Sequence, residues 1–279
     1  MTPKRVAYLG PPGTFSQEAA FLYDAQAKQE PFPSIPAVAT AVSSGMADEG
    51  IVPIENSLEG SVTYTLDLLI QETSLRIKHE LVLPIEHCLM VKEGTERASI
   101  QAIYSHPQAL AQCRGFLERC FPKAEHLASL STAAAVEDMK ASKVPAAAIA
   151  PRLSADLYGA QIIARGIQDN ANNVTRFVVL AQTDHEPTGC DKTSLCFSFA
   201  DDKPGLLYRA MGEFATRNIN LAKIESRPTK SSLGRYYFLI DCEGHREDPL
   251  VKEAIQGLEK MCSMLKVFGS YPRWVAPQS

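Results

Sequence analysis

Short apolar runs alternate with longer helical patterns between residues 5 and 180, and this alternation constrains the fold more than any other feature of the sequence. The apolar runs lie at residues 5–9, 50–54, 100–104 and 146–150. Residues 174–180 (VTRFVVL) are almost wholly apolar, which is typical of a strand buried on both faces of a sheet. Repeated strand–loop–helix units predict an α/β domain with a mainly parallel sheet.

The helices expected after these strands follow from apolar spacing and capping residues. They cover residues 17–29, 63–71 and 108–120, and a further helix begins after Ser131 or Thr132. Serine and threonine are favoured caps, so Ser16 is expected to cap the first of these helices.

The pattern changes near residue 181. Residues 181–192 (AQTDHEPTGCDK) are polar and without hydrophobic period, which predicts a linker. The elements expected beyond it are a strand at 193–200, a helix at 204–217, strands at 219–227 and 234–242, a helix at 248–261 and a strand at 264–268. This β-α-β-β-α-β order is that of the ferredoxin-like split βαβ unit, so a small α+β domain should follow the larger one.

Composition and spacing argue against several classes of partner. The chain has 28 basic and 32 acidic side chains, a net charge of −4 and no polybasic run, so no nucleic-acid partner is expected. No apolar stretch is long enough to span a membrane, and the start MTPKRVAYLG lacks a secretory pattern, so we expect a cytoplasmic protein without a membrane partner.

The seven cysteines and six histidines lack metal-ligand spacing. They predict reduced, mostly buried thiols and no metal.

Polar side chains gather where the predicted strands end, which is where open α/β sheets bind ligands. The loops are 10–16 (GPPGTFS), 53–61 (PIENSLEGS) and 104–108 (YSHPQ), with Gln112 one turn later, and residues 173–177 (NVTRF) follow. Each feature alone has a simpler interpretation. Ser57, Ser61 and Ser105 can be helix caps, His106 a structural hydrogen-bonding group, and Thr175 a residue that favours strands.

Together these motifs resemble the prephenate dehydratase family, of the monofunctional bacterial type, along essentially the whole chain. The matching motifs are G-P-x-G-T-F-S at 10–16, V-P-I-E-N-S at 52–57 with Glu59 and Gly60, Y-S-H-P-Q-x(3)-Q-C at 104–113, and D-x(3)-N-x-T-R-F at 169–177. P-G-L-L at 204–207 and E-S-R-P at 225–228 resemble the phenylalanine-sensing motifs of the ACT domain that this family carries. The family often has P-G-A-L, so Leu206 is a departure that is expected to alter the effector pocket. No region like a chorismate mutase precedes Val6, so the single-function form is expected.

The resemblance implies a two-lobed catalytic domain, like a periplasmic binding protein, with the active site in its cleft. That domain would comprise residues 1–181, with lobe one at about 1–79 and 170–181 and lobe two at about 80–169. The chain would cross between the lobes near 77–83 and 164–169. A linker at 182–192 would lead to a ferredoxin-like ACT domain at 193–272. Because ACT sheets commonly pair across subunits, the resemblance also implies a homodimer or homotetramer.

The implied reaction converts prephenate to phenylpyruvate, carbon dioxide and water in phenylalanine biosynthesis, without a cofactor. Thr175 resembles the family's essential threonine, whose hydroxyl hydrogen-bonds the leaving oxygen. The neutral donors expected to complete the catalytic set are Asn56, Ser57, Ser105 and Gln112. The expected substrate-binding residues are Gly13, Thr14, Ser16, Glu55, Arg176 and Phe177. In an alternating strand Arg176 points away from Thr175, so a structural salt bridge is at least as good an interpretation of it as substrate contact.

L-phenylalanine is implied as the allosteric effector of the ACT domain. The residues expected at its site are Pro204, Gly205, Leu206, Leu207, Asn218, Asn220, Leu221, Glu225, Ser226, Arg227 and Pro228. The loop at 201–205 precedes a helix N-terminus, which suits a carboxylate, whereas residues 225–228 fit an interface salt-bridge cluster equally well. Two alternative functions stay open: arogenate dehydratase, whose substrate differs by an amino group, and a non-catalytic amino-acid sensor.

Overall fold

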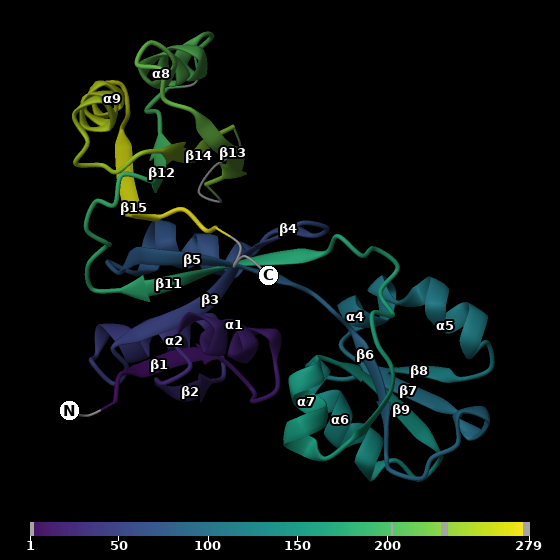
Figure 1. Ribbon diagram of the computed structural model, residues 1–279. Helices are drawn as coiled ribbons and strands as arrows, with labels where there is room; N and C mark the ends of the chain where they lie inside the picture. The colour runs from purple at the N-terminus through teal and green to yellow at the C-terminus, as the bar shows by residue number, and fades with distance from the viewer. Residues whose placement is uncertain (1–2, 202, 230–233, 276–279) are drawn as a thin grey trace. The chain divides into compact units, whose positions relative to one another are not determined.

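The computed structural model describes residues 3–201, 203–229 and 234–275, which form three sheets with flanking helices (Figure 1). The chain folds into two compact units. The first unit comprises residues 1–62 and 81–177, and the second comprises residues 63–80 and 178–279.

The first sheet has the strand order β2-β1-β3-β11-β5, with β4 paired to β3. Its strands are β1 (Arg5–Leu9), β2 (Lys28–Phe32), β3 (Glu49–Asn56), β4 (Gly60–Ser61), β5 (Arg76–Pro84) and β11 (Val174–Ala181). Strand β1 runs parallel to β2 and β3, and helices α1 (Phe15–Tyr23) and α2 (Ile35–Ser43) pack against them. Residues 177–181 of β11 are all buried, which confirms that this strand is covered on both faces.

The second sheet has the strand order β10-β6-β9-β7-β8. Its strands are β6 (Cys88–Val91), β7 (Ala102–Ser105), β8 (Glu125–Ala128), β9 (Ala146–Ala150) and β10 (Gln161–Ala164). Its helices are α4 (Pro107–Gln112), α5 (Arg114–Cys120), α6 (Thr132–Ala141) and α7 (Arg152–Tyr158), with a 3-10 turn η2 (Arg97–Ser99). Alternate residues of β6 and β9 point into two separate apolar clusters, one against α4 and α5 and the other against α6 and α7. Figure 1 shows these helices beside the strands of the sheet.

The chain passes between these two sheets twice. Residues 85–87 connect β5 to β6, and residues 165–173 connect β10 to β11. The connections are hydrogen-bonded to each other, because the amide of Ile85 donates to the carbonyl of Asn173 (2.8 Å) and the amide of Ile167 donates to that of His87 (3.1 Å). The two-lobed α/β organisation is therefore confirmed, although the first crossing lies just beyond the predicted residues 77–83.

The second unit contains the four-stranded antiparallel sheet β13-β14-β12-β15. In chain order its elements are β12 (Asp191–Ser198), α8 (Leu206–Ala215), β13 (Leu221–Pro228), β14 (Tyr236–Glu243), α9 (Pro249–Glu259) and β15 (Met264–Pro272). Helices α8 and α9 pack on one face of this sheet, around a core that includes Phe197, Phe214 and Leu258 (Figure 1). The predicted β-α-β-β-α-β order is confirmed.

Residues 63–80 belong to the second unit although they precede β6 in the chain. They form α3 (Thr63–Asp67), a π-helical turn η1 (Leu68–Glu72) and the first part of β5. Lys266 donates to the carbonyls of Ile70 (3.2 Å) and Thr73 (2.7 Å), and Lys192 donates to both carboxylate oxygens of Glu80 (2.8 and 2.9 Å). These bonds hold the segment against β12 and β15.

Three predicted helices differ from the structure. Helix α1 ends at Tyr23, because the Asp24 carboxylate accepts from the amides of Gln26 and Ala27 in a turn, and β2 occupies the end of the predicted helix. The helices predicted at 63–71 and 108–120 divide into α3 with η1 and into α4 with α5. The predicted cap at Ser16 is wrong, since Thr14 holds that position, whereas the cap at Ser131 is confirmed by its bond from the amide of Ala134.

Candidate active site

Asn56, at the end of β3, holds the hydroxyl of Thr175 at the start of β11. The Asn56 Nδ2 lies 2.9 Å from Thr175 Oγ1 and 2.8 Å from Asn173 Oδ1. The Asn56 Oδ1 accepts from the backbone amides of Leu58 (2.9 Å) and Glu59 (3.1 Å). Because a backbone amide can only donate, these two bonds fix which end of the Asn56 side chain faces Thr175. Thr175 Oγ1 therefore accepts from Asn56, and no acceptor for its own proton occurs among the residues that the structure describes.

The hydrogen bonds continue from Asn56 through Asn173 to Gln112, whose side-chain oxygen also accepts from His87. Since Asn173 Oδ1 accepts from Asn56, its Nδ2 faces Gln112 Oε1 at 3.1 Å. That oxygen also lies 2.9 Å from His87 Nε2. An amide oxygen can only accept, so His87 carries its proton on Nε2. The five connected side chains, here called the Thr175 network, are those of His87, Gln112, Asn173, Asn56 and Thr175.

The fold explains why these five residues meet. Asn56 ends a strand of the first sheet, and Gln112 ends α4 beside the second sheet. His87 and Asn173 lie on the two connections between the sheets. His87, Asn173, Asn56 and Thr175 are all buried, with at most 9% of each residue exposed. Hydrogen bonds in such an environment are less screened than in water, so the network holds its members firmly.

The Thr175 network is electrically neutral. Burial lowers the pKa of His87, and the hydrogen bond to Gln112 opposes that shift only in part. The charged side chains beside it include Glu59, whose Oε1 lies 3.4 Å from Gln112 Nε2, and the pair Arg176 and Glu55, whose Nη1 and Oε2 lie 3.8 Å apart. The structural ion pair considered for Arg176 is therefore present.

The remaining predicted catalytic residues lie beside the network or outside it. Ser57 Oγ accepts from the amide of Val174 (3.0 Å), and the amide of Ser57 donates to the carbonyl of Val174 (2.9 Å), which fixes the start of β11. Ser105 is fully buried, and its hydroxyl donates to the carbonyl of Ile149 (2.7 Å). The structure thus unites Thr175, Asn56 and Gln112, places Ser57 next to them, and commits the Ser105 hydroxyl to the second sheet.

The loop at residues 10–16 packs against α7. Ser154 Oγ donates to the carbonyl of Gly13 (2.7 Å), and Tyr158 OH donates to that of Pro12 (3.0 Å). A Cβ atom at Gly13 would lie 2.7 Å from Ser154 Oγ, and the φ of +87° also favours glycine. The Thr14 hydroxyl donates to the carbonyl of Leu9 (3.2 Å), while Ser16 and Phe177 are buried.

The predicted effector residues fall into three groups within one chain. Gly205, Leu206 and Leu207 line a pocket with Phe199 and Tyr236, and Pro204 immediately precedes them in the chain. Asn218 and Asn220 line a separate pocket with Glu243, just before Leu221 begins β13. The third group, Glu225, Ser226, Arg227 and Pro228, lies further along β13.

Arg227 makes an ion pair inside the second unit. Its Nη2 and Nε lie 2.7 and 3.2 Å from Asp67 Oδ1, and the two side chains are 12% and 20% exposed. Glu225 pairs with Lys223 at 3.2 Å. The E-S-R-P motif therefore connects β13 to α3 in this chain.

Two members of the Thr175 network were not predicted as site residues. Asn173 stands two positions before Thr175, and such spacing places both on one side of an extended strand, which was an available signal. His87 is a lone histidine between Glu86 and the apolar run at 88–91. Nothing local marks its role, because its partner Gln112 is distant in the sequence.

The cysteines do not offer a nucleophile near the network. Burial raises the pKa of Cys88 to about 11 and that of Cys113, directly after Gln112, to about 12. These thiols are protonated at neutral pH and hence unreactive. All seven cysteines are free and most are buried, as predicted; Cys190 is the exposed exception.

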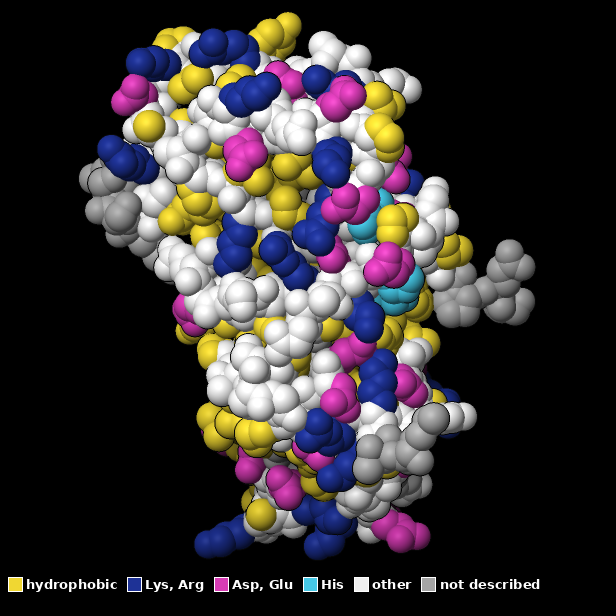
Figure 2. Space-filling model, turned by 90° about the vertical axis from the view of Figure 1, so that its left-hand side faces the viewer, with side chains coloured by type: hydrophobic (Ala, Val, Ile, Leu, Met, Phe, Trp, Pro, Cys, Tyr) yellow, Lys and Arg dark blue, Asp and Glu magenta, His cyan; other side chains and the backbone are white. Residues whose placement is uncertain are grey.

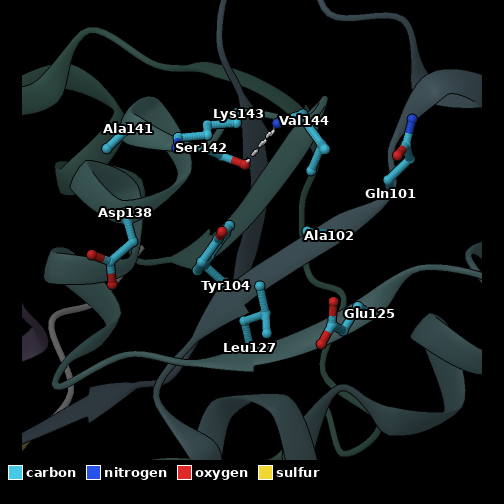
Figure 3. Close-up of a pocket in the computed structure, with 10 residues that line it drawn as sticks. All are labelled: Gln101, Ala102, Tyr104, Glu125, Leu127, Asp138, Ala141, Ser142, Lys143 and Val144. Carbon is cyan, nitrogen blue, oxygen red and sulfur yellow. Dashed lines mark hydrogen bonds between the residues drawn. The ribbon is translucent and has the colours of Figure 1, made fainter.

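The described part of the chain also bears on metal sites, membrane spans, charged faces and other pockets. No group of at least three His, Cys, Asp or Glu side chains suited to a metal occurs there, and no described helix is both long and apolar enough to cross a membrane. Acidic side chains lie among the basic ones on the face shown in Figure 2. The pocket over β7 and β8, shown in Figure 3, includes Tyr104, Leu127 and Asp138 and shares no residue with the Thr175 network.

Comparisons with known proteins agree with the motifs. The sequence model of the prephenate dehydratase family matches residues 6–185, and that of the ACT domain matches residues 196–260. The chain is 42% identical over 271 residues to a bifunctional chorismate mutase/prephenate dehydratase of Aquifex aeolicus, covering 96% of this chain and 74% of that protein. It is 39% identical to a prephenate dehydratase of Mycobacteroides abscessus, with 97% and 90% covered.

Two solved structures are also similar over most of their length. One is a prephenate dehydratase from Arthrobacter aurescens in complex with L-Phe, with a TM-score of 0.89, 37% identity and coverage of 96% of this chain and 90% of that one. The other is GqqA, described as a novel type of quorum quenching acylase, with a TM-score of 0.87, 30% identity and coverage of 97% and 98%.

Proposed function

The chain belongs to the prephenate dehydratase family, and we propose that its Thr175 network carries out the family's reaction. The protein is a carbon–oxygen lyase that converts prephenate to phenylpyruvate, carbon dioxide and water in phenylalanine biosynthesis. The observation that carries the proposed role of the network is the bond from Asn56 to Thr175 Oγ1, which leaves the threonine proton available to a ligand.

The reaction requires one proton at the leaving oxygen, which is that of the 4-hydroxyl of prephenate. The ring carboxylate departs as carbon dioxide, its electron pair passes through the diene, and the bond from the ring to the 4-hydroxyl breaks. The hydroxyl leaves as water when it takes up a proton, which is shared with the Thr175 hydroxyl or relayed from solvent water, because an alcohol is too weak an acid to give up its proton outright. Thr175 is proposed as the positioned donor to this oxygen, because a preorganised donor in a buried site stabilises developing negative charge without reorganisation.

The neutrality of the network suits this chemistry. A strong cation beside the ring carboxylate would stabilise the substrate more than the transition state and so oppose loss of carbon dioxide. Arg176 is held by Glu55 (3.8 Å), which keeps its charge partly compensated. Ser57 and the substrate-binding set Gly13, Thr14, Ser16, Glu55, Arg176 and Phe177 stay proposed contacts of prephenate, whereas Ser105, whose buried hydroxyl donates to Ile149, does not.

Regulation is assigned to the second unit. L-phenylalanine is proposed to bind at residues 204–207 and to inhibit turnover, which is supported by the ACT match and by the L-Phe complex of the Arthrobacter relative. Because the three groups of effector residues are separate within one chain, we propose a homodimer or homotetramer in which two chains complete one site. The proposed domains are 1–181 and 193–272 with a linker at 182–192, and the proposed compartment is the cytoplasm.

One assay separates this function from its alternatives. The purified chain is incubated with prephenate and, in parallel, with arogenate, and formation of phenylpyruvate and phenylalanine is followed. We expect turnover of prephenate and its loss in Thr175→Val. Preference for arogenate would make the enzyme an arogenate dehydratase. Binding of L-phenylalanine without turnover of either substrate would make it a sensor.

A further inference from the structure

We infer that His87 is a positioning residue for catalysis, which donates to Gln112 Oε1 and so keeps that oxygen facing the Asn173 side-chain amide of the Thr175 network. This inference rests on the proposed role of Thr175. His87 acts through three intermediate side chains and is not placed against the substrate.

The orientation of Asn56 determines the orientation of each amide side chain that follows it in the network. The last of these, Gln112, then needs a partner of the right kind. The amides of Leu58 and Glu59 orient Asn56, and each following amide side chain then has only one orientation that pairs a donor with an acceptor. Gln112 Oε1 has to accept from Asn173, so its second partner has to be a donor as well. His87 Nε2 supplies that donor at 2.9 Å.

The surroundings of His87 hold the ring in this role. Its amide donates to Gln168 Oε1 (3.0 Å), and its carbonyl accepts from the amide of Ile167 (3.1 Å). The ring packs edge-on against Phe15, with 5.5 Å between centroids. His87 is 2% exposed, and its Nδ1 has no hydrogen-bond partner among the described residues. The neutral ring with its proton on Nε2 therefore has no competing partner and always presents a donor to Gln112.

Loss of this donor should loosen the network rather than remove a substrate contact. Gln112 would keep only Asn173 and a long contact from its Nε2 to Glu59 (3.4 Å). Its amide could then rotate, and a rotated amide would set its NH2 group against that of Asn173. The strain would pass to Asn56, which aligns Thr175 Oγ1. We therefore expect kcat to fall while the KM for prephenate changes little.

Three substitutions test the geometry of the donor. In His87→Gln the side-chain amide reaches about the position of Nε2, whereas in His87→Asn it reaches only about that of Nδ1. His87→Leu removes the donor altogether. Loss of one of the two donors to Gln112 Oε1 predicts a fall in kcat of about tenfold for Leu and Asn, whereas Gln should stay within about threefold of the parent. In each variant KM should stay within about threefold, because the substrate contacts are retained.

A double-mutant cycle with Gln112→Leu separates positioning from general destabilisation. If His87 acts through Gln112, His87→Leu should have little further effect on kcat in the Gln112→Leu background. The same fold loss in both backgrounds, or equal losses for His87→Gln and His87→Asn, would overturn the inference. If His87→Leu does not fold, judged by circular dichroism, the comparison of Gln with Asn still decides. A parent enzyme without prephenate turnover would overturn the proposed function itself, whereas an active parent with unaffected His87 variants overturns only this inference.

Discussion

Thr175 is distinguished from a valine of nearly the same shape by a single oxygen atom, and the proposed mechanism depends on that atom. Valine also favours strands, so Thr175→Val should keep the fold. We expect kcat to fall by about 100- to 1000-fold, the effect of losing one preorganised donor. KM should change much less, because the hydroxyl acts mostly in the transition state.

Thr175→Ser is the matched control for this substitution, since it keeps the hydroxyl and should retain far more activity. Steady-state kinetics of the three forms, with circular dichroism as a folding control, provide the measurement. A folded Thr175→Val enzyme within about threefold of the parent would assign the threonine to strand formation alone, because a lost donor costs far more. The leaving-group donor would then be sought among Asn56 and Gln112, because the Ser105 hydroxyl already donates to the carbonyl of Ile149.

His87 also predicts how stability depends on pH. Burial lowers its pKa in the folded protein, whereas the unfolded chain has a histidine pKa of about 6.5. The unfolded state therefore binds the proton more readily, so the stabilisation is complete above about pH 6.5 and is lost as the pH falls towards the folded pKa. We expect the free energy of unfolding of the parent to fall more steeply below about pH 6.5 than that of His87→Gln. Urea unfolding at a series of pH values measures this difference, and parallel curves would contradict it.

At the scale of the element, apolar periodicity predicted several segments that bury a face, but it missed β6, whose four residues are all buried. It found β11, whose residues 177–181 are all buried, and the six elements of the small domain. It missed β2 (KQEPF), because an edge strand needs no apolar alternation and tolerates Pro31. It also missed α2, although Ser34 and Pro36 mark its start, and Ser34 caps it by accepting from the amide of Ala37.

The candidate site was predictable only in part, for a related reason. The loop after β3 indicated Asn56, the helix after the loop at 104–108 indicated Gln112, and the motif at 169–177 indicated Thr175, although Asn56 belongs to the first sheet and Gln112 lies beside the second. His87 joins them through a connection between sheets, and neither its neighbours nor its spacing reveals where that connection runs. The ion pair of Arg227 was not predictable from the sequence either, since its partner Asp67 lies in a helix that was assigned to the catalytic domain at 1–181.

The ion pair between β13 and α3 predicts a measurable coupling. Among the described residues, Asp67→Ala would leave the Arg227 guanidinium with contacts of 3.5 Å to two Thr63 oxygens. Hydrogen bonds to charged groups that are partly buried predict a loss of about 1–3 kcal/mol in the free energy of unfolding. In Arg227→Met the further effect of Asp67→Ala should be much smaller.

An exposed ion pair supplies the comparison for that cycle. Arg114 and Glu118 lie 3.7 Å apart on α5 and are mostly exposed. Glu118→Ala should change stability by less than about 0.5 kcal/mol, because solvent screens such pairs. Urea unfolding of all variants gives the coupling energies. A coupling between Asp67 and Arg227 no larger than the effect at Glu118 would show that the pair does not hold β13 to α3.

For the whole molecule, the two compact units divide the chain differently from its sequence families. Residues 63–80 lie within the span matched by the prephenate dehydratase family, yet they group with the ACT residues. They also follow the Asn56 loop directly in the chain. A change in the second unit therefore has a short covalent route to the residue that orients Thr175, which gives phenylalanine regulation a physical basis.

Leu206 provides the test of that regulation in the complete chain. It lines the pocket beside Gly205 and Leu207, and it is larger than the alanine that the family often has there. Leu206→Ala should widen the pocket, and we expect it to lower the L-phenylalanine concentration for half inhibition while turnover without effector stays the same. Leu157→Ala is the control, because Leu157 is an exposed residue of α7 outside this pocket. Initial rates of prephenate turnover against L-phenylalanine concentration measure both. An unchanged response in Leu206→Ala, or an equal shift in Leu157→Ala, would place the effector elsewhere than at residues 204–207.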